Sequence, residues 1–197
     1  MFSSRLRDYH FILASRSPRR QQLLADAGFI FDVAPSDVDE SYPGHLEGSE
    51  IAEYLAVRKA GFFQKETLGP GDIVIAADTV VWCDKKVLDK PSDRDDAFRI
   101  IRELSANTHE VITGVCLKSR NNEIVFSEIT SVTFNSLSDD EIWYYIDNFK
   151  PFDKAGAYGI QEWIGIVANS RIDGSYFNVM GLPVHRLIRE LKEFTRE

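Results

Sequence analysis

The sequence is poor in the residues from which redox and metal sites are usually built. It has two cysteines, Cys83 and Cys116, which lie far apart in apolar, strand-like runs, and its four histidines show no metal-ligand spacing. This pattern predicts two small buried thiol side chains in place of a disulfide or a nucleophile. We therefore expect a reduced, cytoplasmic protein.

Long apolar runs and an excess of positive charge are also missing. No segment approaches the length of a membrane span, and the N-terminal stretch has no long apolar core followed by a small-residue cleavage site. With 31 acidic and 23 basic residues, the formal net charge is −8. An acidic surface argues against a nucleic-acid or membrane partner, although a local basic pocket still suits a small anionic substrate.

Familiar nucleotide and hydrolase loops are absent as well. The sequence has no Walker loop, no Rossmann fingerprint and no nucleophile elbow. It also lacks internal repeats, low-complexity tracts and linkers. Its 44% hydrophobic and 27% charged residues are ordinary for a globular protein. The length suits one core, so we predict a single domain over residues 1–197.

Strand-like and helix-like segments alternate along the chain, which predicts a mixed α/β fold. Strands are expected at 11–14, 30–34, 73–77 and 164–168, with hairpins over 80–88 and 109–134. Residues 35–48 have the composition of a loop. Helices are expected after four candidate N-cap residues and at the C-terminal end, around 184–191. The candidate caps are Ser17, Ser49, Ser92 and Ser138, the last forming a capping box with Glu141.

The first candidate site lies where the first strand passes into the first helix. Ser17 is a good N-cap, Pro18 suits the first helical position and Gly28 ends the helix. Arg19 and Arg20 then fall in the first turn, where their charge opposes the helix dipole. That placement makes sense if an anion such as phosphate binds there. Two solvated surface arginines are the alternative.

The second candidate is Asp78, followed by Thr79, at the end of the apolar run 73–77. A carboxylate at the carboxyl end of a buried strand often points into a cleft in α/β proteins. Such a group holds a divalent metal or takes a proton from water. A turn-forming aspartate is the alternative, but the apolar residues 80–82 give no turn signal.

Further charged residues are informative only in combination, since each alone is more often a solvated charge. Lys59 interrupts an otherwise amphipathic helix, Glu40 ends a loop and Lys90 precedes a helix start. The segment 153–161 begins with Asp153 and combines small residues, which permit close approach of a ligand, with the polar Gln161.

Taken in order and spacing, these stretches resemble the Maf family of nucleoside triphosphate pyrophosphatases, from about residue 13 to 191. The matching segments are residues 15–20, 38–40, 59–60, 77–79, 88–91, 105–114, 153–161 and 181–183. The resemblance implies a long twisted mixed sheet flanked by helices with a deep central cleft, similar to the inosine triphosphatase fold. It also implies a homodimer and a divalent metal cation, Mg²⁺ or Mn²⁺, as cofactor.

The resemblance implies roles for individual residues in hydrolysing a nucleoside triphosphate to the monophosphate and pyrophosphate. Asp78 is the implied proton acceptor, and Asp78 and Glu40 are the implied metal ligands, although one carboxylate need not do both jobs. The implied phosphate-binding residues are Ser15, Arg20, Lys59 and Lys90. Two departures from the family pattern are Ala106, where glycine is frequent, and Glu162-Trp163, where small residues are common.

Three positions divide the family by substrate, and this sequence has Arg19, Thr79 and Gln161 there, as in the branch acting on dTTP and UTP. A glutamine amide both donates and accepts, which suits the N3–H and carbonyl of uracil or thymine. The alternatives are a purine or modified nucleotide (ITP or 7-methyl-GTP), or a non-enzymatic regulator of septum formation. The resemblance also suggests removal of non-standard nucleotides and a link to cell-division arrest.

Overall fold

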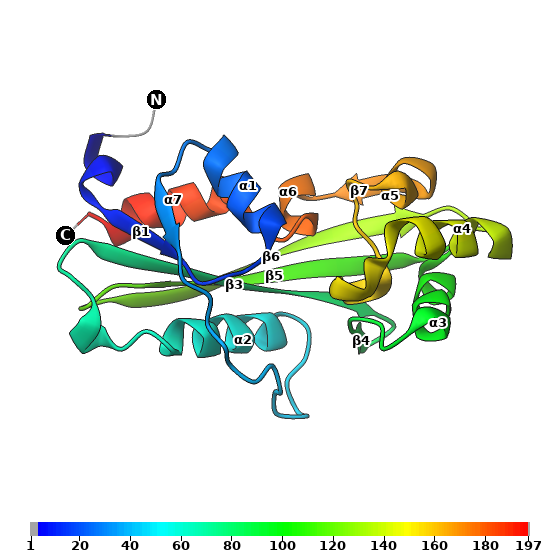
Figure 1. Cartoon of the computed structure of the whole chain (residues 1–197), viewed down its shortest axis with the longest axis horizontal. Helices are drawn as coiled ribbons and strands as arrows, with labels where there is room; N and C mark the ends of the chain where they lie inside the picture. Colours follow the sequence, from blue (N-terminus) through cyan, green and yellow to red (C-terminus); the bar gives the residue numbers. More distant parts are fainter. Residues whose placement is uncertain (1–3, 197) are drawn as a thin grey trace.

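The computed structural model describes residues 4–196 and is built on a seven-stranded mixed sheet with helices on both faces (Figure 1). The strand order is β2-β1-β3-β5-β6-β7, with β4 paired to β3. The strands are β1 (His10–Leu13), β2 (Phe31–Val33), β3 (Asp72–Cys83), β4 (Lys86–Leu88), β5 (Thr108–Lys118), β6 (Glu123–Phe134) and β7 (Asn169–Asp173). The predicted α/β class with a flanked mixed sheet is confirmed.

Seven α-helices and four short 3₁₀ turns surround this sheet within the described residues. The helices are α1 (Pro18–Asp26), α2 (Ser49–Gly61), α3 (Arg94–Leu104), α4 (Asp139–Phe149), α5 (Trp163–Val167), α6 (Tyr176–Val179) and α7 (Val184–Phe194). The 3₁₀ turns are η1 (Ser4–Asp8), η2 (Lys65–Thr67), η3 (Pro151–Asp153) and η4 (Ala155–Ala157). Between residues 4 and 196, no helix combines the length and apolar content needed to cross a membrane.

Three long antiparallel strands form the spine of the molecule. β5 pairs with β6 from Thr108↔Thr133 to Lys118↔Glu123, and β3 pairs with β5 over most of its length. The tight turn between β3 and β4 places Asp84 and Lys85 at positive φ, +47° and +64°. A two-residue turn with positive φ matches the twist of the paired strands β3 and β4. Residues 119–122 connect β5 to β6, so both predicted hairpins are present.

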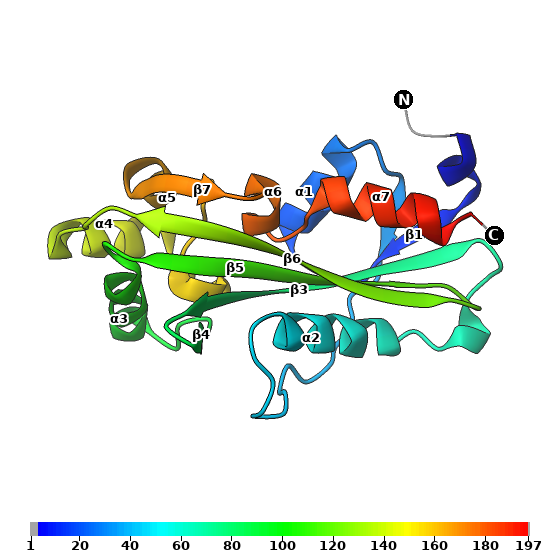
Figure 2. The same ribbon diagram turned by 180° about the vertical axis from the view of Figure 1, so that it is seen from behind.

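Helices cover opposite faces of the spine because side chains alternate along β3. Ile73 and Ile75 belong to the cluster beneath α1 and α7, whereas Val74 and Ala76 face the cluster beneath α2. Figure 2 shows α2 on one face, and α1 with α7 on the other. The same alternation sends consecutive polar side chains of β3 to opposite faces.

Several helix boundaries follow the predicted caps, and others differ by one residue. Ser17 accepts a hydrogen bond from the Arg20 amide, and Ser138 forms the expected capping box with Glu141. Gly48 precedes α2, so Ser49 is its first residue and not its cap, and Asp93 caps α3 in place of Ser92. Asp93 is the N-cap because its carboxylate accepts a hydrogen bond from the Asp96 amide at 2.8 Å.

Two predictions about strands are wrong. The run 164–168 is not a strand, because residues 163–167 form α5 and the strand β7 follows it. A five-residue apolar run has no period that separates a buried helix turn from a strand. The strand predicted to end at residue 77 continues to Cys83, so Asp78 lies in the middle of β3.

Candidate active site

The cleft opens at a gap along one edge of β3. β1 pairs with β3 only as far as Leu13↔Ile75, and β4 joins the same edge from Val81 onward. Residues 76–80 therefore have a free edge where the carboxyl end of the parallel strand β1 leaves the sheet. Ligands of open α/β sheets bind at such points. Asp78 thus reaches the cleft from mid-strand, although it is not at a strand end.

A cavity of about 510 Å³ occupies this gap. Its walls come from α1, α2, β3, the loop 35–40 and the segments 153–158 and 179–181. The lining includes six basic and four acidic side chains. A local excess of positive charge in a chain of net charge −8 is suited to an anionic ligand. The basic residues are Arg16, Arg19, Arg20, Lys59, Lys90 and Lys154; the acidic ones are Asp37, Glu40, Asp78 and Asp153.

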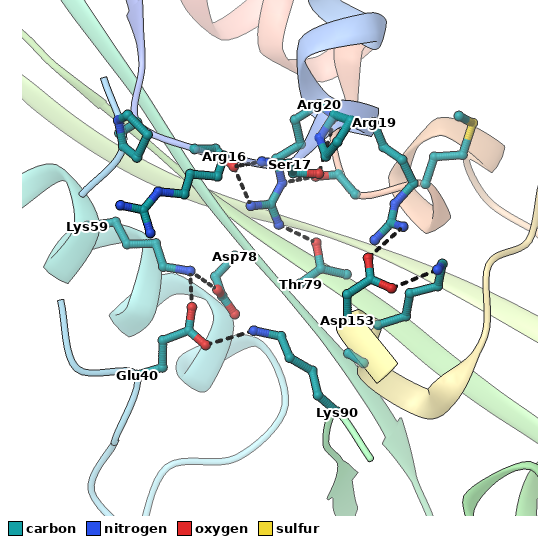
Figure 3. Close-up of a pocket in the computed structure, with 18 of the residues that line it drawn as sticks. Arg16, Ser17, Arg19, Arg20, Glu40, Lys59, Asp78, Thr79, Lys90 and Asp153 are labelled. Carbon is teal, nitrogen blue, oxygen red and sulfur yellow. Dashed lines mark hydrogen bonds and ion pairs between the residues drawn. The ribbon is translucent and has the colours of Figure 1, made fainter. Parts of the chain in front are cut away.

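Arg20 closes part of the free edge of β3. Its guanidinium donates to the Ala77 carbonyl at 2.9 Å, to the Gly181 carbonyl at 2.8 Å and to Thr79 Oγ1 at 3.0 Å. It also donates to Ser15 Oγ at 3.3 Å. A guanidinium has five N–H donors, so one remains for a ligand. Arg20 therefore connects α1 to β3 and to Gly181, and it keeps one donor for an anionic ligand (Figure 3).

Asp78 lies at one end of a chain of alternating charges. Lys59 Nζ, on α2, contacts Asp78 Oδ1 and lies 2.8 Å from Glu40 Oε1. Lys90 Nζ lies 2.9 Å from Glu40 Oε2. Asp78 and Lys59 are both only 9% exposed. Burial disfavours an isolated charge, and each of the two side chains neutralises the charge of the other. These ion pairs between Asp78, Lys59, Glu40 and Lys90 hold the Asp78 carboxylate at the bottom of the cleft.

The pKa of Glu40 is lowered to about 2 by this arrangement. Burial acts to raise it, but hydrogen bonds from Lys59 and Lys90 outweigh that effect. Glu40 is therefore ionised throughout the physiological range. Its charge offsets the charges of Lys59 and Lys90.

The carboxylates of Asp78 and Glu40 fit a hydrated divalent cation. Both reach the same Lys59 ammonium, and Asp78 Oδ2 makes no hydrogen bond or ion pair with residues 4–196. Carboxylate oxygens are the ligands that Mg²⁺ and Mn²⁺ prefer. A second group, Cys83 with Asp84 and Glu103, fits less well. Burial raises the pKa of the Cys83 thiol to about 11, and Lys86 pairs with Glu103 at 2.7 Å.

The structure brings together eight of the nine predicted site residues. Ser15, Arg19, Arg20, Glu40, Lys59, Asp78, Thr79 and Lys90 all line the cavity. Gln161 does not: its side chain is exposed, and it lies beside Gly159 outside the described cavity wall. Sequence reasoning assigned no role to Asp153 and Lys154, which do line the cavity, although the small residues following them drew attention to their segment.

The strand order and the flanking helices define a mixed α/β fold that is also found in a solved structure. The solved structure of the Staphylococcus aureus Ham1 protein is similar, with a TM-score of 0.53 over 94% of this chain and 99% of that chain, at 15% identity. That likeness confirms the expected fold.

The Maf-like protein family model matches residues 10–194, and the chain belongs to this family. Its relatives include proteins named dTTP/UTP pyrophosphatase from Bacteroides fragilis (50% identical, covering 94% of this chain and 96% of that protein) and Flavobacterium johnsoniae (47% identical, 97% and 98%). A third, from Phocaeicola vulgatus, is 50% identical and covers 95% and 97%.

Proposed function

We propose that the protein hydrolyses nucleoside triphosphates, preferentially dTTP and UTP, to the monophosphate and pyrophosphate. The main observation in support of this reaction is the buried carboxylate of Asp78 at the bottom of a cleft whose lining has an excess of positive charge. The names of relatives at 47–50% identity over nearly the whole chain support the same reaction.

The cleft supplies what hydrolysis at the α-phosphorus requires. Anionic oxygens shield that atom, so positive charge must surround the phosphates while a water is placed in line with the leaving pyrophosphate. Lys59, Lys90 and the remaining donor of Arg20 provide the charge, and Ser15 provides a hydroxyl. Because these groups are held before the substrate arrives, they stabilise developing charge with little reorganisation.

Asp78 takes the proton of the attacking water in this proposal. Its Oδ1 is held by Lys59, which leaves Oδ2 facing the cleft as the proton acceptor. Glu40 and Asp78 would hold Mg²⁺ or Mn²⁺, which when bound neutralises phosphate charge and acidifies water. Lys59, between the two carboxylates, keeps them in place before the cation and substrate bind.

Base preference is proposed to depend on Arg19, Thr79 and Gln161. Arg19 and Thr79 line the cavity, and Thr79 is held by hydrogen bonds to Arg20 and to Thr113 Oγ1 at 2.9 Å. The Gln161 amide lies on the same loop as Tyr158, which does line the cavity. The proposal requires this loop to move toward the cavity when the substrate binds, because Gln161 lies outside the cavity wall.

The test is a pyrophosphate-release assay on a nucleotide panel with Mg²⁺, Mn²⁺ or EDTA. We expect kcat/KM to be highest for UTP and dTTP, and a phosphate detector to respond only after inorganic pyrophosphatase is added. EDTA should abolish turnover, and added metal should restore it. Direct phosphate release would place cleavage at the terminal phosphate, and no turnover on any nucleotide would favour a non-enzymatic regulator.

We further propose that the protein is a cytoplasmic homodimer. The support is the family to which the chain belongs, together with two buried free cysteines, Cys83 and Cys116. Light scattering on the purified chain should give twice its mass of 22.4 kDa. A monomer at micromolar concentration would contradict the dimer.

A further inference from the structure

At the end of the cavity opposite Glu40, three charged side chains form a row. Asp153 Oδ2 lies 3.6 Å from Arg19 Nη1, and Asp153 Oδ1 lies 2.8 Å from Lys154 Nζ. Figure 3 shows Arg19 and Asp153 on one side of Asp78, and Lys59 with Glu40 on the other. A triphosphate whose α-phosphate is at Asp78 and whose tail lies toward Lys59 therefore places its base near this row.

Each member of the row has spare hydrogen-bonding capacity. Among residues 4–196, Arg19 makes only the 3.6 Å ion pair with Asp153, so its N–H donors remain available to a ligand. Lys154 donates a hydrogen bond to Asp153 Oδ1 and forms an ion pair with Glu162 Oε1 at 3.3 Å, which leaves at least one of its three N–H donors for a ligand. The Asp153 carboxylate is 65% exposed and retains lone pairs on both oxygens. The row thus offers a donor, an acceptor and a donor.

The surrounding walls suit an aromatic base. Apolar side chains line the same cavity as Arg19 and Asp153: Val81, Val111, Val179, Met180 and the ring of Tyr158. Flat apolar contacts supply binding energy without selecting among bases. Selection must therefore come from the polar groups in the wall.

We propose that Asp153, flanked by Arg19 and Lys154, recognises the edge of uracil and thymine. This edge presents a carbonyl acceptor, the N3–H donor and a second carbonyl acceptor, which is the complement of the row. Asp153 accepts from N3–H, and Arg19 and Lys154 each donate to one carbonyl. The inference rests on the proposed function, which places a pyrimidine nucleotide in this cleft.

The same arrangement rejects the other bases. Cytosine presents a lone pair at N3, which would face the Asp153 carboxylate, and an amino donor, which would face a cationic donor. Guanine presents two adjacent donors, of which the second would meet a cation. A polar group that loses water to the bound base and gains no partner weakens binding strongly, so the mismatch discriminates more than shape does.

Contacts outside the cavity hold the row in position. Lys154 is 7% exposed, and its second partner, Glu162, is in turn contacted by the Tyr145 hydroxyl. Tyr145 also accepts a hydrogen bond from the Gly159 amide at 3.0 Å. Burial would raise the pKa of Asp153, but the hydrogen bond and charge of Lys154, with the charge of Arg19, hold that pKa below its usual value. Asp153 is therefore an ionised acceptor.

Asp153→Asn is the decisive variant, because its amide can turn a donor toward N3 of cytosine. We expect the ratio of kcat/KM for UTP over CTP to fall by at least ~30-fold, partly through a gain on CTP. Asp153→Ala should lose most activity on UTP without gaining on CTP. Asp37→Asn, which removes the same charge from another wall of the cavity, should leave the UTP/CTP ratio within about twofold of wild type.

Binding without turnover separates this inference from the proposed reaction. Calorimetric titration of UTP and CTP in EDTA measures base preference whether or not the protein hydrolyses either nucleotide. A UTP preference that Asp153→Asn removes supports the inference even if no pyrophosphate is released. Unchanged UTP/CTP ratios in both assays for Asp153→Asn, with its thermal unfolding close to wild type, would overturn it. Turnover and pyrophosphate release by wild type would then still support the reaction.

Discussion

At the scale of the residue, Asp78 has the most sharply defined role. Asp78→Asn keeps the shape of the side chain and leaves Lys59 paired with Glu40, so the fold should persist. An amide cannot take a proton from water, and turnover should fall by at least ~100-fold. Steady-state kinetics with circular dichroism on the same sample measure both points. If the folded variant kept a near-normal turnover rate, Asp78 would have only a structural role.

A substitution at Gln161 tests its proposed role in base preference. It is the predicted specificity residue that lies outside the cavity wall. Gln161→Glu removes the amide donor, and if the amide reads the base, activity on UTP and dTTP should fall selectively relative to purine nucleotides. A panel of kcat/KM values tests this. An unchanged profile would leave base recognition to the residues already in the wall.

At the scale of the element, the close packing of α2 on the sheet depends on Gly114. A Cβ atom there would lie 2.3 Å from the Ala52 carbonyl carbon and 2.6 Å from the Glu53 nitrogen, which are backbone atoms of α2. The helix must therefore move if Gly114 gains a side chain. Because α2 also contains Lys59, a movement of this helix would displace the Lys59 ammonium from the Asp78 carboxylate.

Gly114→Ala should accordingly lower the free energy of unfolding by about 1–3 kcal/mol, as overpacking does, and also lower kcat/KM. Urea unfolding and steady-state kinetics measure the two effects. Gly61→Ala is the matched control, because it lies at the end of the same helix with no atom within 4 Å of a new Cβ. Equal stability of the two variants would contradict close packing of α2 on β5.

Another element-scale feature explains why glycine suits position 106, where this sequence has alanine. Ala106 stands where glycine is frequent, and its φ is +57°. The turn between α3 and β5 therefore needs the left-handed conformation that glycine adopts freely. Alanine adopts it at a cost of about 1–2 kcal/mol.

At the scale of the whole molecule, a buried histidine couples folding to pH. His109 is 2% exposed, and burial lowers its pKa from the usual 6.5 to about 4. Between these values the unfolded chain binds a proton that the folded chain does not. The stability gained from the neutral ring is complete above pH 6.5 and is lost as the pH falls toward 4.

His109→Gln removes this titration and keeps a polar partner for the Tyr158 hydroxyl, which lies 2.8 Å from His109 Nε2. When the pH is lowered from 7.5 to 4, the free energy of unfolding of wild type should fall by about 3 kcal/mol more than that of the variant. Urea unfolding over this range measures it, since the carboxylates titrate equally in both proteins. Parallel stability curves would show that His109 does not titrate in this way.

Much of the fold was accessible from local patterns. Ser17 and Ser138 marked helix starts, and the polar turn near residue 120 marked the β5–β6 hairpin, because caps and turns depend on neighbouring residues only. The run 164–168 was misassigned because its apolar residues fit either α5 or a strand. The extent of β3 was missed because its pairing with β5 depends on distant residues.

The sequence by itself determined the family, the α/β class and the types of residue at the site, because order and spacing of motifs are properties of the chain. The tertiary structure decided which of these residues meet. It placed Asp78 in mid-strand beside Lys59, kept Gln161 out of the wall and brought Asp153 into it. Contacts between residues far apart in sequence arise from strand register and helix packing, and these minimise the free energy of the whole fold.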